Sequence, residues 1–392
     1  MKVKLSDLYD IGSSKRVFQS EWQKSGVPFY RAREIAKLSI DGYVDNELFI
    51  NEDLYLEYIN MYGKPEAGDV MVTGVGTLGV CYIVKPEDRF YFKDGNILWF
   101  KQKAKDRILS EYLVKAFDSK EAKEFIDKNS SGTTVGTFTI QTAKKMEISL
   151  PSIQEQRNII QKITKIESVI KQRRQQLQLL DTLIKARFVE LFGDPEMNPM
   201  GWEQVTLNDV CSSIVRGPFG SALKKEFFVE PDESTYKVYE QKHAIQKSAT
   251  IGTYYITEEK YQELKRFECL PGDILMSCSG TMGELYQLPD GCEKGVINQA
   301  LCKFTLNEKI LPICFLVYMK QTIGNLETKG SGIQNIAAVS YVKQMPINLP
   351  PMGVQNEFEQ FVKQVDKSKV AVQKALDETQ LLFDSLMQQY FG

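Results

Sequence analysis

The chain has 392 residues, of which 43% are hydrophobic and 26% are charged, and its formal net charge is −2. This composition is that of a globular protein, and the length predicts two or more domains. The near-neutral charge gives no overall signal for nucleic acid, and neither a signal peptide nor an apolar run of about 18 residues is present. We therefore expect a soluble, cytoplasmic protein without a membrane partner.

Cysteine and histidine usage limits the metal sites, disulfides and catalytic triads that the chain could form. The seven cysteines include no C-x-x-C pair and their number is odd, so we expect buried, reduced thiols rather than a zinc site or a disulfide framework. A Ser/His/Asp triad or a His-rich metal site would have to use the single histidine, His243. No catalytic or metal-ligating residue is predicted.

The first part of the chain has a short predicted strand at residues 3–7, followed by a locally basic segment. Residues 13–37 contain six Lys or Arg against two Glu, a local net charge of +4. Such a patch suits phosphate contacts, although most patches of this kind are only solvated surface. Lys15, Arg16, Arg31 and Arg33 are its candidate nucleic-acid contacts, and pairing of the last two with Glu34 is the alternative.

A glycine-rich segment follows at Gly74-Val75-Gly76-Thr77-Leu78-Gly79, which has the form G-x-G-x-x-G. In a dinucleotide-binding site the third glycine would open a helix. Here it precedes the β-type run 80–84, so we expect a hairpin with a glycine-rich tip. A dinucleotide-binding enzyme remains the alternative of another class.

The next segments predict a strand at 96–100, a helix at 108–117 and a loop at 130–139. From Leu150-Pro151 to Phe192-Gly193 the chain then reads as one long helix. Its apolar residues recur at alternating steps of four and three, which predicts a heptad seam and a partner helix. The seam comprises Ile159, Ile163, Ile166, Ile170, Leu177, Leu180 and Ile184, with Arg173 and Arg187 as polar breaks.

This long helix occurs a second time, from Leu349-Pro350 to Phe391-Gly392, at a constant offset of 199 residues. Its seam comprises Phe358, Val362, Val365, Val372, Leu376 and Phe383, with breaks at Lys369 and Thr379. These polar breaks are expected either to fix an antiparallel register or to face docked subunits.

The region before the helix is repeated as well. Residues 3–7 match 205–209, and Gly68-Asp69 matches Gly272-Asp273, as do the glycines and threonines that follow at an offset of 204. The second copy is expected to have a strand at 299–304, a helix at 312–320 and a loop at 330–332. The halves differ most between the first strand and the hairpin, as expected if they bind related but non-identical targets.

The second half adds its own polar side chains in these variable segments. The candidate nucleic-acid contacts there and at the two hairpin tips are Thr77, Arg216, Lys224, Lys225, Gln241, Lys242, His243, Ser279 and Thr281. A structural histidine and simple turn residues are the alternatives for His243 and the tip residues.

The predicted organisation has four parts: globular domains at 1–150 and 194–349, and spacer helices at 151–193 and 350–392. The predicted fold class is α+β, with two pseudo-repeated domains separated by an antiparallel two-helix coiled coil. We expect a dumb-bell with a pseudo-two-fold axis, in which helices of about 57 Å hold the domains apart. Two such domains could read half-sites more than one DNA turn apart.

With these features the sequence resembles the specificity (S) subunit of bacterial type I restriction-modification enzymes. The resemblance is carried by the two Leu-Pro helix starts, the two helices ending in Phe-Gly, the twin Gly-Asp hairpins and the Asn298-Gln299 pair. It covers essentially the whole chain. One departure is Asp94-Gly95, which stands where the second copy has Asn298-Gln299.

The resemblance implies a non-catalytic subunit whose two target recognition domains each read one half of a bipartite site on double-stranded DNA. It implies two methylation (M) subunits as partners, and restriction (R) subunits unless the system only methylates. S-adenosylmethionine, ATP and Mg would then belong to the partners, and no cofactor is expected in this chain. A purely structural coiled-coil adapter is the remaining alternative.

Overall fold

The computed structural model describes residues 2–130, 136–328 and 339–392. The chain forms two compact units, Met1–Gln175 with Gln373–Gly392, and Gln176–Val372. Each unit contains one globular domain and a part of each long helix. The predicted loops at 130–139 and 330–332 fall partly or wholly outside the described residues.

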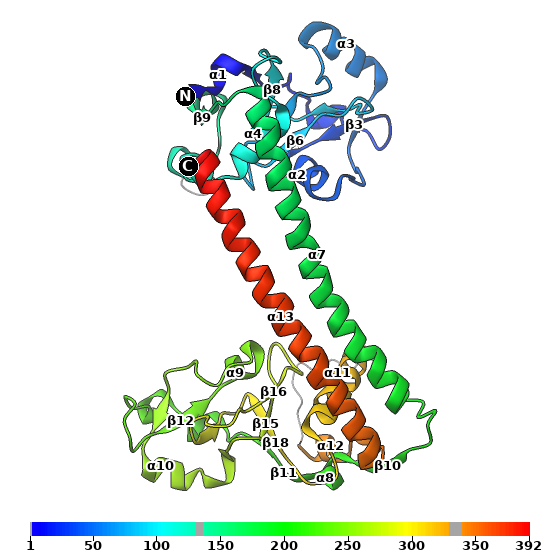
Figure 1. Cartoon of the computed structure of the whole chain (residues 1–392), viewed down its shortest axis with the longest axis vertical. Helices are drawn as coiled ribbons and strands as arrows, with labels where there is room; N and C mark the ends of the chain where they lie inside the picture. The colour runs from blue at the N-terminus through cyan, green and yellow to red at the C-terminus, as the bar shows by residue number, and fades with distance from the viewer. Residues whose placement is uncertain (1, 131–135, 329–338) are drawn as a thin grey trace. The chain divides into compact units, whose positions relative to one another are not determined.

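The domain of the first unit is built on a four-stranded antiparallel sheet in the order β2-β8-β5-β6 (Figure 1). Its strands are β2 (Tyr9–Gly12), β8 (Ile97–Gln102), β5 (Val70–Thr73) and β6 (Cys81–Ile83). A second sheet holds β4 (Phe49–Ile50), β3 (Val27–Tyr30) and β7 (Tyr91–Phe92), and β1 (Lys2–Lys4) pairs with β9 (Glu147–Ser149). The helices are α1 (Leu5–Leu8), η1 (Gln19–Glu21), α2 (Ala32–Asp41), α3 (Glu52–Tyr62), α4 (Ser110–Asp118), α5 (Lys120–Asn129) and α6 (Ile140–Lys145).

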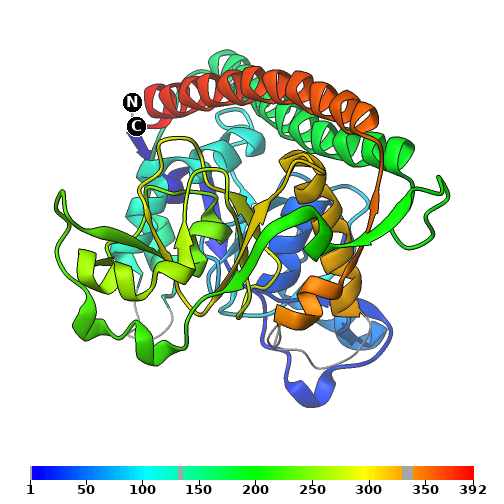
Figure 2. The same ribbon diagram turned by 90° about the horizontal axis from the view of Figure 1, so that it is seen from below.

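The domain of the second unit repeats the order of the main sheet and adds a fourth strand to the second sheet. Figure 2 gives a second view of the chain. Its main sheet has the order β11-β18-β15-β16, formed by Cys211–Arg216, Leu301–Leu306, Ile274–Ser277 and Leu285–Gln287. The second sheet joins β13 (Tyr255–Ile256), β12 (Tyr236–Tyr239), β17 (Gly295–Ile297) and β14 (Glu268–Cys269), and β10 (Glu203–Thr206) pairs with β19 (Pro346–Leu349). The helices are α8 (Leu207–Val210), η2 (Gly220–Ala222), η3 (Lys225–Phe227), α9 (Gln241–Gln246), α10 (Glu258–Glu263), η4 (Lys265–Phe267), α11 (Pro312–Thr328) and α12 (Val339–Gln344). The internal duplication and the α+β class are thus confirmed.

The glycine-rich segments form hairpin tips in both domains. Thr73 donates its hydroxyl hydrogen to the Thr77 carbonyl and accepts from the Val80 amide, and Ser277 makes the same two bonds in the second domain. Gly79 has φ +76° and leads into β6, a strand. The dinucleotide-binding alternative fails here, because the third glycine opens no helix.

The two long helices are α7 (Ile153–Phe192) and α13 (Met352–Phe391). A repeated glutamine ties the start of each helix to its own domain. Gln156 is buried, accepts a hydrogen bond from the Leu109 amide (2.9 Å) and donates to the carbonyls of Arg107 and Pro151 (2.8 and 2.9 Å). Gln355 makes the corresponding three bonds in the second unit. This clamp joins the helix start to the beginning of α4 or α11.

The helices pair antiparallel within each unit. In the first unit Lys162 contacts Tyr390 (3.4 Å) and Arg173 bonds Thr379. In the second unit Asp181 pairs with Lys369 (2.8 Å), and Arg187 pairs with Glu357. Every predicted seam residue is buried or half-buried, as a heptad seam requires. The polar breaks bond across the pair, which favours a role in fixing the register.

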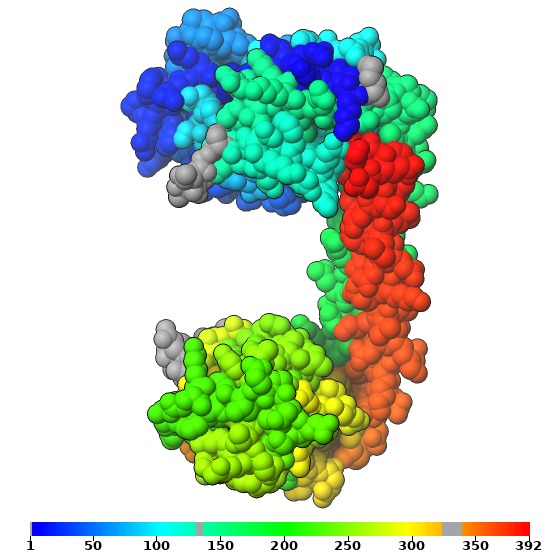
Figure 3. All heavy atoms as spheres, turned by 90° about the vertical axis from the view of Figure 1, so that its left-hand side faces the viewer, coloured from blue at the N-terminus to red at the C-terminus, as the bar shows by residue number. Residues whose placement is uncertain are grey.

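The Phe-Gly ends of both helices belong to the domain cores. Phe391 packs on Tyr112 with ring centroids 5.1 Å apart, and Phe192 packs on Phe358 at 5.4 Å. Figure 3 shows the last turns of α13 lying against the first domain. Each domain is therefore fused to one end of α7 and one end of α13.

Candidate nucleic-acid interface

In the first domain, the loop after β2 presents basic side chains on a firmly held backbone. Ser13 and Ser14 donate hydroxyl hydrogen bonds to carbonyls in β8 and β7 (2.9 and 2.6 Å). The Lys15 amide donates to the Tyr91 hydroxyl at 3.0 Å. The side chains of Lys15 and Arg16 are exposed. The loop therefore offers two cations without needing to fold around a partner.

Arg16 has one acidic neighbour, since its Nε lies 3.0 Å from an Asp94 carboxylate oxygen. The arginine side chain is 67% exposed. An exposed pair of this kind contributes little to stability, so the guanidinium can exchange Asp94 for a phosphate oxygen. The departure of Asp94 from the Asn298 pattern thus has a local electrostatic role.

At the start of α2, two arginines flank a buried glutamate. Arg31 and Arg33 donate to the same Glu34 oxygen at 2.8 and 2.9 Å, and Arg33 also reaches Glu47 at 2.8 Å. Burial raises the pKa of Glu34, but the hydrogen bonds from both arginines outweigh it and lower the pKa to about 2. Arg31 is only 28% exposed, whereas Arg33 is 62% exposed. Arg33 is therefore the better placed of the two to reach DNA.

The equivalent turn at the start of α9 corrects one predicted contact. His243 is fully buried, its Nδ1 accepts from the Glu240 amide (2.8 Å), and its Nε2 donates to the Ile251 carbonyl (2.7 Å). Burial lowers the pKa of His243, which keeps the ring neutral. In the first domain Glu34 accepts from the Arg31 amide in the same way (2.9 Å). His243 is a structural capping residue with no ring nitrogen left for DNA.

Its neighbours Gln241 and Lys242 are half-buried and lie close to the hairpin tip. The side-chain Nε2 of Gln241 donates to the Thr281 carbonyl at 3.3 Å, which joins the first turn of α9 to the β15–β16 tip. Lys242 lies 2.6 Å from a Glu240 oxygen and over the Tyr254 ring at 5.4 Å. The tip presents Thr281, and polar groups of two elements therefore converge there.

The remaining candidates lie at separate places in their own domains. Thr77 is exposed at the β5–β6 tip, the counterpart of Thr281, and Ser279 is half-buried at the second tip. Arg216 ends β11 and donates to the Gln299 carbonyl at 3.3 Å. In the loop that follows, Lys224 and Lys225 are exposed.

Two exposed aromatic residues were not among the predicted contacts. Phe18 is 59% exposed and Phe219 is 88% exposed, each in the loop after the first strand of the main sheet. The one sequence signal for them is that each phenylalanine stands in a polar, basic loop, where a core residue is not expected. Their exposure places them with the basic side chains as candidate contacts.

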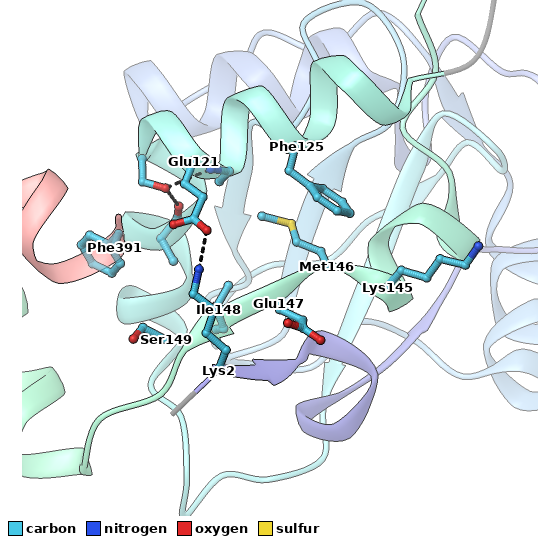
Figure 4. A pocket seen from close by; sticks show the side chains of 12 residues that line it. Lys2, Glu121, Phe125, Lys145, Met146, Glu147, Ile148, Ser149 and Phe391 are labelled. Carbon is cyan, nitrogen blue, oxygen red and sulfur yellow. Dashed lines mark hydrogen bonds and ion pairs between the residues drawn. The ribbon is translucent and has the colours of Figure 1, made fainter.

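A cavity of about 260 Å³ in the first unit lies apart from these loops. Figure 4 shows it between α5, β9 and the end of α13, where Lys2 pairs with Glu121. Phe125, Met146 and Phe391 provide its apolar wall. None of the candidate nucleic-acid contacts lines it.

The cysteine thiols are not among the candidate contacts. All seven cysteines are free thiols and six of them are buried, as expected. Within residues 2–130, 136–328 and 339–392, no helix has both the length and the apolar character needed to span a bilayer.

Comparison with known proteins adds an independent result. The family model for the type I restriction modification DNA specificity domain matches the chain twice, at residues 1–179 and 199–379. A Haemophilus influenzae protein assigned as a type I restriction enzyme specificity subunit is 31% identical over 43% of this chain and 40% of its own length. The MjaIX specificity subunit of Methanocaldococcus jannaschii is 22% identical over 98% of this chain and 90% of that protein.

Solved structures show the same fold over the whole chain. A structure from work on complex assembly and conformational transition of the type I R-M system has a TM-score of 0.68 and 17% identity, and covers 100% of this chain and 97% of that one. The S subunit from M. genitalium has a TM-score of 0.52 and 14% identity, with 100% and 96% covered. The predicted family is confirmed, and with it the prediction of a specificity subunit rather than an enzyme.

Proposed function

The chain belongs to the type I restriction-modification DNA specificity family, and on that basis we propose that it reads the two halves of a bipartite DNA site. Each globular domain would contact one half-site. The observation that carries this proposal is one scaffold present twice with two different sets of polar side chains on it. A scaffold that served only to join helices would not need two unlike polar surfaces.

Within each domain, the exposed or half-buried polar groups divide into two kinds. Gln241 and Arg33 have side chains that can form paired hydrogen bonds with base edges in the major groove. Lys15, Lys224 and Lys225 suit phosphates, which fix the position of a domain on the duplex without reading sequence. The proposed readers therefore lie at the first turns of α2 and α9, and Gln241 joins the second of these turns to the β15–β16 tip.

We further propose that the paired helices carry two adenine methyltransferase subunits, and restriction subunits where the complex also cleaves. Exposed leucines support a docking role for the helices, because large apolar groups left in water favour a protein partner. In the first unit these are Leu381 and Leu382, and in the second unit Leu179 and Leu183. S-adenosylmethionine, ATP and Mg would be bound by those partners, and the complex would act in the cytoplasm, where the DNA lies.

Co-expression with a methyltransferase subunit of the same organism, followed by sequencing of methylated adenines, tests the proposal. We expect methylation at one asymmetric motif made of two short halves and a spacer of fixed length. The matched control is the methyltransferase subunit expressed without this chain, which should leave that motif unmethylated. Methylation without sequence preference, or the same motif in the control, would contradict the proposal.

A further inference from the structure

The two domains share a detail that lies in their most divergent region. Phe18 is followed directly by the 3-10 helix η1, and Phe219 is followed directly by η2. The carbonyl of Phe18 accepts from the Glu21 amide at 3.0 Å, and that of Phe219 accepts from the Ala222 amide at 2.9 Å. The same backbone device therefore presents an exposed phenylalanine in both copies, although the two loops differ in sequence.

Both rings stand on anchored backbone. The residue before each ring, Val17 or Pro218, is buried in the domain. The Phe18 amide also donates to the Glu21 carboxylate at 2.6 Å. A single exposed apolar residue is ordinary, but an exposed ring on a held backbone, in the corresponding loop of both copies, indicates a shared kind of partner.

Basic residues flank both rings along the chain. Lys15 and Arg16 lie three and two residues before Phe18, and Arg216 lies three residues before Phe219. Lys224 and Lys225 follow the second ring along the same loop. Duplex DNA is complementary to an apolar ring with basic neighbours. Its phosphates carry negative charge, and its bases have apolar faces and edges.

We propose that Phe18 and Phe219 contact bases directly, each as an apolar wedge that packs into the stacked base pairs of its own half-site. This inference rests on the proposed DNA-reading function and deepens it. Basic side chains would bind the phosphates. The ring would pack between two neighbouring base pairs, which is possible only where those base pairs unstack. Sequence preference then includes the ease with which that step unstacks.

The test uses the full chain in complex with its methyltransferase subunits and a duplex that carries the motif found by sequencing. Phe18→Ala and Phe219→Ala are compared with Ile40→Ala and Met197→Ala, which also remove strongly exposed apolar side chains. We expect each Phe variant to bind the motif duplex about 5- to 100-fold more weakly, in line with the usual effect of removing an aromatic contact to a base. Binding to a random duplex and the melting temperature should stay unchanged.

A second measurement separates the half-sites. A 2-aminopurine base placed in one half should fluoresce more on binding if a ring unstacks it, and only the variant of the corresponding domain should lose this increase. Unchanged affinity and fluorescence in both Phe variants would overturn the inference while leaving DNA reading intact. Equal weakening on motif and random duplexes would also overturn it. A wild-type complex that does not distinguish the duplexes would overturn both this inference and the proposed function.

Discussion

The buried glutamine at the start of α7 gives the sharpest stability prediction. Gln156→Leu keeps the size of the side chain but removes three hydrogen bonds, those to the Leu109 amide and to the carbonyls of Arg107 and Pro151. Arg107 is exposed, so its carbonyl can bind water, whereas the other two groups are half-buried. Two half-buried groups left without partners cost up to about 1–3 kcal/mol each, and the apolar replacement recovers a part of this. We expect a loss of about 2–4 kcal/mol.

Urea denaturation of the full chain measures this loss, and hydrogen exchange locates it. The amides of α4 should exchange faster in Gln156→Leu, while those of α11 in the other unit should not change. The matched control is Gln154→Leu, an exposed position two residues away that should stay within about 0.5 kcal/mol of wild type. Equal stability of the two variants would refute the clamp.

Three further predictions concern the hairpin, the helix pair and the charge cluster. Gly79→Ala should destabilise the first domain by about 1–3 kcal/mol, because φ at this position is +76° and the new methyl would lie 2.6 Å from Ile126 Cδ1. Ile126→Val removes that methyl group, so adding it should restore a part of the lost stability in thermal melts. A double-mutant cycle of Arg173→Leu and Thr379→Val should give a coupling of about 0.5–2 kcal/mol in denaturation, and a value near zero would deny these residues a role in register. Glu34 has a folded-state pKa of about 2 against an ordinary 4.5, so its stabilisation is complete above about pH 4.5 and is lost as the pH falls towards 2. Unfolding free energy should fall more steeply with acid in wild type than in Glu34→Gln, and parallel curves would contradict the cluster.

Local periodicity was sufficient for the helices and hairpins. The heptad spacing of residues such as Ile163 and Phe358 identified their buried face, since a stripe at that period has no use in a helix without a partner. The strand that follows Gly79 excluded a dinucleotide loop in the same way. Repetition in the chain added the topology, because a duplicated pattern implies a duplicated domain.

Side-chain roles at the interface could not be predicted from type alone. His243 and Glu34 both cap their helix from inside the domain, and only tertiary packing decides whether such a residue faces water or the core. The three-residue spacing from Arg31 and Glu240 was the one available signal. Phe18 and Phe219 were not predicted as contacts, because phenylalanine is normally expected in a core and both are exposed.

The most direct test of the central claim compares methylated motifs after changing one proposed base-reading side chain in each domain. Arg33→Ala changes the first domain and Gln241→Ala changes the second, and Lys85→Ala is the control, at an exposed lysine outside the proposed contacts. Sequencing of methylated adenines in cells that express each complex should show that Arg33→Ala relaxes the base preference in one half of the motif. Gln241→Ala should relax the base preference in the other half. Identical effects of both variants on both halves, or a continuous motif without two halves, would contradict the account.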